Sequence, residues 1–467
     1  MTKNVADLIL NASLSDLSFY FVGIGGVSMS GLALFLIERG CKVCGSDISK
    51  NENTQRLQQK GVTVYFGHDK NNVPQKADVC VVNSAISQLN EEVLECKRRN
   101  IKIITRGELL GAILNSFDYS IAVAGCHGKT TTTALAYETL LNCQKNPTLF
   151  LGGNYKGQNY VGGKGKVCIA EACEYTSSFL SLSPKISVLL NIDYDHVDCF
   201  ANIEEVKNAF CDFANKTATE GVVVAESCVA TFLKRNGVKR KIISFGVGEG
   251  NFDCDYFADN LICNNGCYSF DLYEKKAFLG TIDLTVCGKR LVDNALATVA
   301  VARLLGCEFA KIKMGLESFV GVERRWQAFE SDFTNVVADY AHHPTEIKNL
   351  LAIAKNFDYQ NIYVLFQPHT YSRTKRLLNE FASCFCGATR VVVLPVFSAR
   401  ETPTDGGQSE DLVEAISKYV SCKMAYTFED AKEILSCATK KDILLVVGAG
   451  DVIGFCSKEF LTANKEK

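Results

Sequence analysis

A glycine-rich segment in the first third of the chain has the residue types that bind phosphate. An apolar, β-branched run ends at Gly125, and Gly125 and Gly128 allow the following backbone to wrap around an anion. Lys129 supplies a positive charge for the β- and γ-phosphates, and the Thr130 hydroxyl is a ligand for Mg²⁺. The order of strand, glycine loop and helix start predicts a P-loop. Its spacing is short, because Val123 stands where the common motif has its first glycine.

Acidic and imidazole side chains follow two further apolar runs. Glu171 and Glu174 come after the first run, and either carboxylate can hold Mg²⁺ beside Thr130. The segment 193–198 holds three aspartates and His196, which predicts a second metal site or polar contacts to phosphate. Because the carboxyl ends of parallel strands meet at one sheet edge, we expect these groups near the P-loop. Solvated surface turns are the alternative for both segments.

Two loops nearer the C-terminus combine histidine with groups that suit an amino acid. Asp339, His342 and His343 follow one predicted strand, and His369 and Arg373 follow another. Arg373 suits a carboxylate in bidentate geometry, and Asp339 suits an ammonium group. Either His342 or His343 alone can instead be a buried structural residue. A nucleoside triphosphate beside a carboxylate and an amine indicates ligation through an acyl phosphate.

The first turn of the chain is similar to a dinucleotide-binding fingerprint. Gly23 and Gly25 follow an apolar run, and Ser28 replaces the third glycine of the pattern. Asp47 ends the second predicted strand, about where a ribose-binding carboxylate belongs. This turn predicts a nucleotide or sugar-nucleotide site, or a tight turn that binds nothing. An NAD-dependent oxidoreductase would account for it but would leave the P-loop without a role.

Strands and helices alternate along the chain, which predicts an α/β fold with doubly wound, parallel sheets. We expect three domains: a Rossmann-like domain at 1–115, a central P-loop domain with a smaller β-rich part at 116–323, and a Rossmann-like C-terminal domain at 324–467. In the last domain we expect strands at 335–338, 362–366, 390–394 and 443–447, and helices at 345–355, 374–384, 411–418 and 429–437.

The composition excludes several classes of protein. With 47% apolar and 22% charged residues among 467, the chain resembles an ordinary globular protein. A net charge of −2 gives no basis for a nucleic-acid partner or an anionic membrane. Residues 1–17 lack the pattern of a secretion signal and no apolar run reaches a membrane span, so we expect a cytoplasmic protein. The 21 cysteines lack zinc-finger spacing, and we expect free thiols.

Motifs along nearly the whole chain resemble those of the Mur ligases, enzymes of peptidoglycan precursor synthesis. In chain order they are GIGGVSMSGLA, GCHGKTTT, EACEY, NIDYDHVD, DYAHHPTE, FQPHTYSRT and GAGD. The resemblance implies ATP-dependent ligation of L-alanine to the lactoyl carboxylate of UDP-N-acetylmuramate. The carboxylate would take the γ-phosphoryl group of ATP, and the amine would then displace phosphate from the acyl phosphate.

The resemblance also implies roles for individual residues. Lys129, Glu174 and His196 would be catalytic, and Thr130, Glu174 and His196 would hold Mg²⁺, with two ions expected. The residues implied for ATP are Gly125, Cys126, His127, Gly128, Lys129, Thr130, Thr131 and Asn294. Those implied for the UDP substrate are Gly23, Gly25, Gly26, Val27, Ser28, Met29, Asp47, Ser84 and Arg106. Those implied for the amino acid are His342, His343 and Arg373.

The chain departs from the family pattern at two places. Arg290 and Leu291 replace a His–Asn pair near the adenine, which leaves Asn294 as the expected contact. Some relatives carry a carbamylated lysine, but Lys207 is the nearest lysine to that position here, and we do not expect the modification.

Three other ligand-binding classes remain as alternatives. A ligase that attaches a recycled peptide to the same muramic acid is the nearest, and FQPHTYSRT favours the alanine enzyme over it. A folate-polyglutamate ligase would lack the N-terminal GIGG domain. A non-enzymatic nucleotide switch would not explain the three loops with histidine, aspartate and arginine. The sequence leaves the oligomeric state open.

Overall fold

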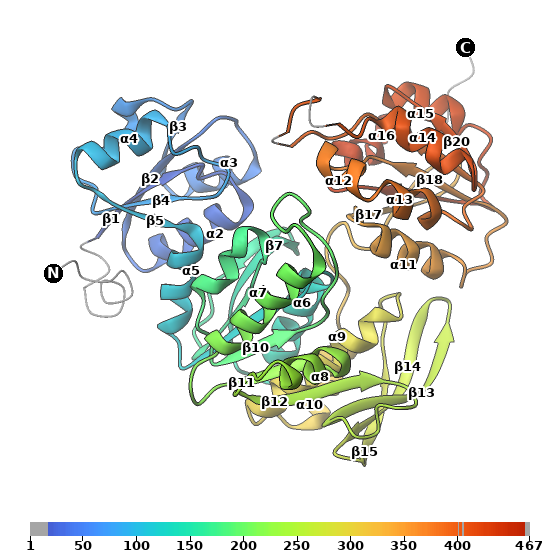
Figure 1. Ribbon diagram of the computed structural model, residues 1–467, viewed down its shortest axis with the longest axis horizontal. Helices are drawn as coiled ribbons and strands as arrows, with labels where there is room; N and C mark the ends of the chain where they lie inside the picture. The colour runs from blue at the N-terminus through green and yellow to red at the C-terminus, as the bar shows by residue number, and fades with distance from the viewer. Residues whose placement is uncertain (1–16, 400, 404–405, 463–467) are drawn as a thin grey trace.

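The computed structural model describes residues 17–399, 401–403 and 406–462, and these fold into three successive α/β units (Figure 1). Residues 1–16, which hold most of the segment where we expect no secretion signal, lie outside the described part of the chain. The predicted α/β class with mostly parallel sheets is confirmed. No described helix combines the length and apolarity that a bilayer crossing requires.

The first unit is a five-stranded parallel sheet in the order β3-β2-β1-β4-β5. The chain leaves β1 at Gly23, where the strand order turns from β2 to β4, and ligands of open α/β sheets bind at such a point. The strands are β1 (Ser18–Val22), β2 (Lys42–Asp47), β3 (Thr63–Phe66), β4 (Val79–Val82) and β5 (Lys102–Thr105). The α-helices are α2 (Val27–Glu38), α3 (Glu52–Gln59), α4 (Glu91–Arg98) and α5 (Arg106–Asn115).

The central unit has a ten-stranded sheet in the order β15-β14-β13-β12-β11-β10-β6-β9-β7-β8. It is parallel from β13 to β7, while β14, β15 and β8 add antiparallel ends, which include the expected β-rich part. The strands are β6 (Tyr119–Ala124), β7 (Thr148–Tyr155), β8 (Gln158–Val161), β9 (Val167–Glu171), β10 (Ile186–Leu189), β11 (Val222–Glu226), β12 (Lys241–Val247), β13 (Tyr256–Asn264), β14 (Cys267–Glu274) and β15 (Ala277–Asp283).

Strand β6 is apolar on both faces because helices cover both sides of this sheet. Ala122 and Ala124 face one core, to which α5, α7 and α8 contribute. Ile121 and Val123 face the other core, formed with α6, α9 and α10. The helices are α6 (Lys129–Asn142), α7 (Ile203–Lys216), α8 (Ser227–Arg235), α9 (Arg290–Leu304) and α10 (Phe309–Glu317).

A β-hairpin that the sequence analysis missed, β7–β8, attaches the first unit to the central one. Asn159 donates to the hydroxyl of Ser30 on α2 at 2.8 Å. Tyr160 donates its hydroxyl to Glu38 at the end of the same helix, at 2.5 Å. These contacts fix α2, and with it the first nucleotide-type turn, against the central sheet.

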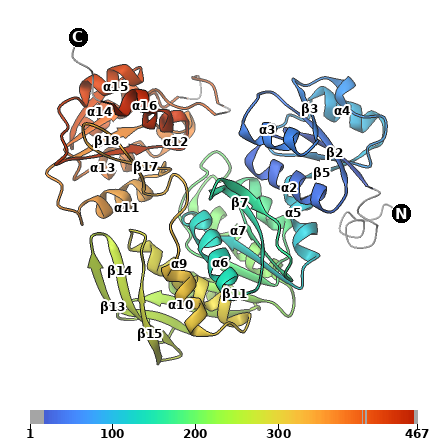
Figure 2. The same cartoon turned by 180° about the vertical axis from the view of Figure 1, so that it is seen from behind.

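The C-terminal unit is a six-stranded sheet in the order β16-β17-β21-β18-β19-β20, antiparallel at β16 alone. The helix expected at 374–384 is wrong as a single element, because α12 and α13 are separated at Leu377. Both views show the first and third units on the same side of the central one (Figure 1, Figure 2). The elements are β16 (Gln327–Phe329), β17 (Asn335–Asp339), α11 (Pro344–Ala354), β18 (Ile362–Phe366), α12 (Tyr371–Arg376), α13 (Leu378–Cys384), β19 (Arg390–Val393), α14 (Ser409–Ser417), β20 (Ser421–Met424), α15 (Phe428–Ile434), β21 (Ile443–Val447) and α16 (Lys458–Leu461).

Candidate functional site

A P-loop forms at the carboxyl end of β6. Gly125 has φ 147° and Gly128 has φ 84°, in the left-handed region where a side chain strains the backbone. A Cβ on Gly125 would also lie 3.0 Å from the Cβ of Leu190. No side chain of the described residues caps α6 at Gly128, so the N–H groups of its first turn are left for an anion. The backbone here is suited to a phosphate group.

Lys129, Glu174 and His196 meet beside this loop. Lys129 Nζ donates to the carbonyl of Gly125 at 2.6 Å and to Glu174 Oε1 at 2.9 Å. His196 Nε2 lies 3.2 Å from the same carboxylate oxygen. Burial raises the pKa of Glu174, but the charge of Lys129 and the contact with His196 outweigh burial and leave that pKa below its usual value. Glu174 is therefore an ionised carboxylate in a nearly water-free position.

This cluster also fits a magnesium ion. Glu174 Oε2 is buried without a hydrogen-bond partner among the described residues, so one carboxylate oxygen remains for a cation. His196 has φ 53°, a strained value of the kind found at functional sites. Glu171 accepts the N–H of Gly152 at 2.7 Å, and the neighbouring Thr130 hydroxyl favours its charged form. Both carboxylates considered for Mg²⁺ thus lie near the loop, and Glu174 is the one beside His196.

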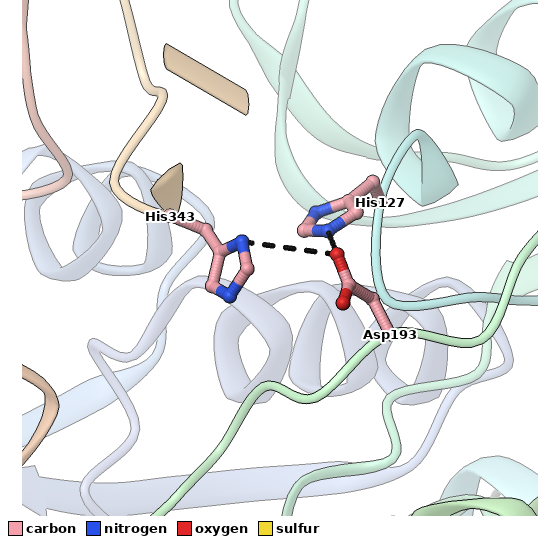
Figure 3. Close-up of side chains that lie close together, drawn as sticks. All are labelled: His127, Asp193 and His343. Carbon is pink, nitrogen blue, oxygen red and sulfur yellow. Dashed lines mark hydrogen bonds and ion pairs between the residues drawn. The ribbon is translucent and has the colours of Figure 1, made fainter. Parts of the chain in front are cut away.

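A second polar network joins the P-loop to the C-terminal unit (Figure 3). His127 Nε2 lies 2.9 Å from Asp193 Oδ2, and His127 Nδ1 lies 3.3 Å from Glu346 Oε1. His343 Nδ1 lies 3.9 Å from Asp193 Oδ2, and the Thr345 hydroxyl donates to that oxygen at 2.8 Å. Asp193 follows β10, whereas the other three partners lie at the start of α11. Three segments that are distant in sequence therefore meet at this point.

Stability linked to His127 is expected to decline as the pH rises from 6.5 to about 9. Burial lowers the pKa of His127, but its hydrogen bond to Asp193 and its ion pair with Glu346 raise it to about 9 from the ordinary value of 6.5. The folded protein holds this proton more tightly than the unfolded chain does. The contribution of protonated His127 to the free energy of unfolding is therefore complete below pH 6.5 and lost above about pH 9. Thermal unfolding of the wild type and His127→Gln across this pH range is the measurement. The difference between their Tm values should narrow as the pH rises. A constant gap would contradict the assignment.

Arg373 and Asp195 form a buried ion pair between the C-terminal and central units. Nε and Nη2 of Arg373 donate to Asp195 Oδ1 at 3.2 and 2.9 Å, and Nη1 donates to the carbonyl of His369 at 3.4 Å. Burial raises the pKa of Asp195, but the charge of Arg373 holds it well below its usual value. The guanidinium expected to bind an amino-acid carboxylate is thus held by a carboxylate of the protein.

The other polar groups of the C-terminal loops also have partners within the protein. Asp339, expected to suit an ammonium group, accepts the N–H groups of Trp326 and Ala341 at 2.9 and 2.8 Å. His342 Nδ1 lies 3.1 Å from a backbone carbonyl two residues earlier. Burial lowers the pKa of His342 to about 4, so this imidazole is neutral near pH 7.

Glu346 and Arg325 belong to the same region and were not identified from the sequence. Arg325 Nη1 lies 3.7 Å from Glu346 Oε1 and 3.8 Å from Asp339 Oδ1. Glu346 lies in the first turn of α11, four positions after His342, and its Oε2 is 3.5 Å from His342 Nδ1. That spacing within DYAHHPTE was a signal that could have identified the glutamate.

A cavity of about 270 Å³ lies beside the P-loop at the start of α9. Asn294, implied as the adenine contact, lies so close to the loop that a Cβ on Gly128 would be 3.2 Å from its Oδ1. Burial raises the pKa of Asp293 to about 6. Glu226 and Asp293 were missed by the sequence analysis, although Glu226 ends an apolar strand as Glu171 does. The cavity is lined by His127, Gly128, Leu190, Asn191, Glu226, Arg290, Asp293 and Asn294.

The first unit brings several residues implied for the UDP substrate to one sheet edge. Asp47 Oδ2 accepts the N–H of Gly25 at 2.8 Å, so this carboxylate supports the turn itself. Arg106 Nη1 donates to the Ser28 hydroxyl at 3.1 Å. Met29 is buried at 1% exposure, so its side chain belongs to the core. Of the remaining residues implied for this site, Gly23 and Gly26 lie on the turn after β1, Val27 begins α2, and Ser84 follows β4.

Family models match all three units of the chain. The model described as "Mur ligase family, catalytic domain" matches residues 18–118, "Mur ligase middle domain" matches 123–302, and "Mur ligase, glutamate ligase domain" matches 324–450. The chain is similar to the UDP-N-acetylmuramate–L-alanine ligase of Clostridium acetobutylicum, at 40% identity over 93% of this chain and 95% of the relative. The ligase of the same name from Caldanaerobacter subterraneus subsp. tengcongensis is 39% identical, over 96% and 98%.

Solved structures give the same result for the fold. The UDP-N-acetylmuramate–alanine ligase of Thermotoga maritima matches with a TM-score of 0.78 and 28% identity, over 95% of this chain and 98% of that one. A murein peptide ligase from Psychrobacter arcticus matches with a TM-score of 0.72 at 20% identity, over 95% and 98%. The second likeness concerns the fold alone.

Proposed function

Because the chain belongs to the Mur ligase family, we propose that it joins L-alanine to the lactoyl carboxylate of UDP-N-acetylmuramate in an ATP-dependent step of peptidoglycan biosynthesis. The observation that carries this function is the Lys129–Glu174–His196 cluster at the P-loop, which the polar loops of the C-terminal unit face. Relatives named for this activity align with more than nine-tenths of the chain.

Ligation proceeds in two displacement steps, which the protein assists by placing charge. A carboxylate oxygen of the muramoyl substrate attacks the γ-phosphorus of ATP, the bond to the β-phosphate oxygen breaks, and ADP leaves an acyl phosphate behind. The nitrogen of L-alanine then attacks the acyl carbon, loses its proton, and expels phosphate from a tetrahedral intermediate. Lys129 and the N–H groups at the start of α6 stabilise the negative charge on the phosphoryl group. Exclusion of water by the apposed units protects the acyl phosphate.

Thr130, Glu174 and His196 are our candidates for holding magnesium, two ions in all. Bound there, Mg²⁺ supplies positive charge opposite the phosphate oxygens. The buried Glu174 Oε2, which has no hydrogen-bond partner among the described residues, supports this assignment.

The substrate subsites follow from the same arrangement. Gly125–Thr131 would bind the phosphates, and the cavity at Asn294 would take the base, since both adjoin Gly128. The turns of the first unit around Ser28 and Arg106 would bind the UDP moiety. His342, His343 and Arg373 remain our candidates for the L-alanine site, with Asp195 holding Arg373 in place.

We also propose domain boundaries at 115/116 and 323/324 and a cytoplasmic location. Each boundary falls between the sheets described above, after α5 and before β16. The location follows from the substrates, because ATP and UDP-linked sugars are cytoplasmic metabolites.

The purified protein is expected to release phosphate from ATP when UDP-N-acetylmuramate, Mg²⁺ and L-alanine are all present. Each amino acid is assayed in turn, and the ligated product is identified by mass spectrometry. Omission of the muramate substrate is the control, because acyl-phosphate formation requires its carboxylate. Dependence on a tripeptide in place of L-alanine would indicate the recycling ligase, the alternative that FQPHTYSRT disfavours. No phosphate release with any amino acid or with the tripeptide would contradict both functions.

A further inference from the structure

Two imidazoles and a carboxylate converge where the P-loop meets the C-terminal unit (Figure 3). One ligand atom each from His127, Asp193 and His343 lie within 4.8 Å of one another. The distances to Asp193 Oδ2 are 2.9 Å from His127 Nε2 and 3.9 Å from His343 Nδ1. Donor atoms about 2.0–2.1 Å from a tetrahedral zinc ion lie roughly 3.3 Å apart. The two distances to Asp193 lie on either side of this value, so side-chain movements would bring the three atoms into a zinc coordination shell.

The hydrogen bonds of His343 indicate which of its two ring nitrogens carries the proton. The N–H of Thr345 donates to His343 Nδ1 at 3.3 Å, so Nδ1 carries no proton. The proton is then on Nε2, which lies 3.2 Å from the carbonyl of Tyr194 and donates to it. Nδ1 is thus the unprotonated nitrogen, 3.9 Å from Asp193 Oδ2, and a cation bound there would take its lone pair in place of the bond from Thr345.

The outer contacts of the other two residues have the form found around metal ligands. Glu346 Oε1 lies 3.3 Å from His127 Nδ1, so a carboxylate orients the imidazole and leaves Nε2 facing Asp193. Asp193 accepts the Thr345 hydroxyl at Oδ2 and the Tyr194 N–H at Oδ1, both at 2.8 Å. Each of the three inner groups is therefore held in place by a second contact.

We propose that His127, Asp193 and His343 form a zinc-binding site that joins the central and C-terminal units. Two imidazoles with one carboxylate suit Zn²⁺, for which histidine nitrogen and carboxylate oxygen are common ligands. Water would take the fourth position. The site differs from the Glu174–His196 cluster, where Lys129 and the expected magnesium belong.

Zinc at this position would oppose nucleotide binding. His127 is part of the P-loop and lines the cavity beside Gly128, so tethering it to α11 holds the loop in its present conformation. The ion would act as an inhibitor that keeps the C-terminal unit closed on the loop. This consequence rests on the proposed ATP site, but zinc binding itself does not.

Cobalt substitution of the metal-free, full-length protein tests the site independently of ligase activity. Co²⁺ bound by imidazole and carboxylate gives visible ligand-field bands without the thiolate-to-cobalt band that cysteine ligands produce. We expect such a spectrum, reversed by added Zn²⁺, in the wild type and in His68→Gln, a control that removes a histidine paired with Glu92 in the first unit. His343→Gln should lose the spectrum, and Glu346→Gln should weaken cobalt binding by about 10–100-fold.

Two results would overturn the proposal. One is a thiolate band, which would place the ion at a cysteine such as Cys173. The other is cobalt binding of equal strength in the wild type and His343→Gln. Zinc-edge anomalous diffraction from crystals of the wild type gives a test that does not depend on the folding of any variant, because the ion must lie within bonding distance of His127 and His343.

Discussion

Replacing Lys129 by Met is expected to lower kcat by about 10³-fold or more, because the γ-phosphoryl group loses the charge that stabilises it in transfer. Lys129 Nζ donates to the carbonyl of Gly125 and to Glu174 Oε1, so its charge lies beside the P-loop. The measurement is the rate of phosphate release at saturating substrates. Binding of a non-hydrolysable ATP analogue should weaken far less than kcat falls, since the loop backbone remains.

A matched control separates chemistry from folding in this experiment. Lys164→Met removes an exposed lysine of the same unit and should leave kcat unchanged. Because Lys129→Met removes the charge that offsets the burial of Glu174, some loss of stability is expected as well. Unfolding curves give the folded fraction by which each rate is corrected. A variant that keeps more than a tenth of the corrected wild-type rate would show that Lys129 does not act on the phosphoryl group.

The P-loop could be predicted because its signals are local. The apolar strand, the glycines at 125 and 128 and the following lysine lie within a dozen residues, and each has a direct backbone or charge consequence. Glu174 and His196 could be placed near it for a similar reason, because each follows a parallel strand that ends at the same sheet edge.

Contacts between units could not be predicted in the same way. Arg373 and Asp195 are 178 positions apart, and nothing in either segment specifies the other as its partner. The expectation that Arg373 would face a bound amino acid therefore missed the carboxylate that holds it. His127 shows the same limit, since the loop sequence contains no signal for Glu346 on α11.

Some elements were missed because their local patterns were weak. The β7–β8 hairpin contains several glycines and polar residues, and it is stabilised by contacts with α2 that no short pattern encodes. The single helix expected at 374–384 is interrupted at Leu377, where φ is −106° and ψ is 23°. Arg376 lies just before the break and donates to the carbonyl of Val197, so a contact with the central unit accompanies the interruption.

Replacing Arg373 by Met is expected to lower kcat/KM for L-alanine by about 30-fold or more, because truncating one partner of a buried charge pair costs about 2–5 kcal/mol. Asp195→Asn should have a smaller effect, since it loosens the guanidinium but leaves it present. If Asp195 acts by positioning Arg373, adding Asp195→Asn to Arg373→Met should change kcat/KM little further.

Thermal stability should change differently from kcat/KM across the wild type, Arg373→Met, Asp195→Asn and the double variant. Arg373→Met leaves the Asp195 carboxylate 5% exposed without its guanidinium, at a cost of up to about 5 kcal/mol. Asp195→Asn in that background removes the stranded charge, so the double variant should unfold at a higher Tm than Arg373→Met. Activity that recovers together with Tm would instead mean that the pair serves only to hold the two units together. Activity that stays low while Tm recovers assigns the guanidinium to the L-alanine site and the carboxylate to its positioning.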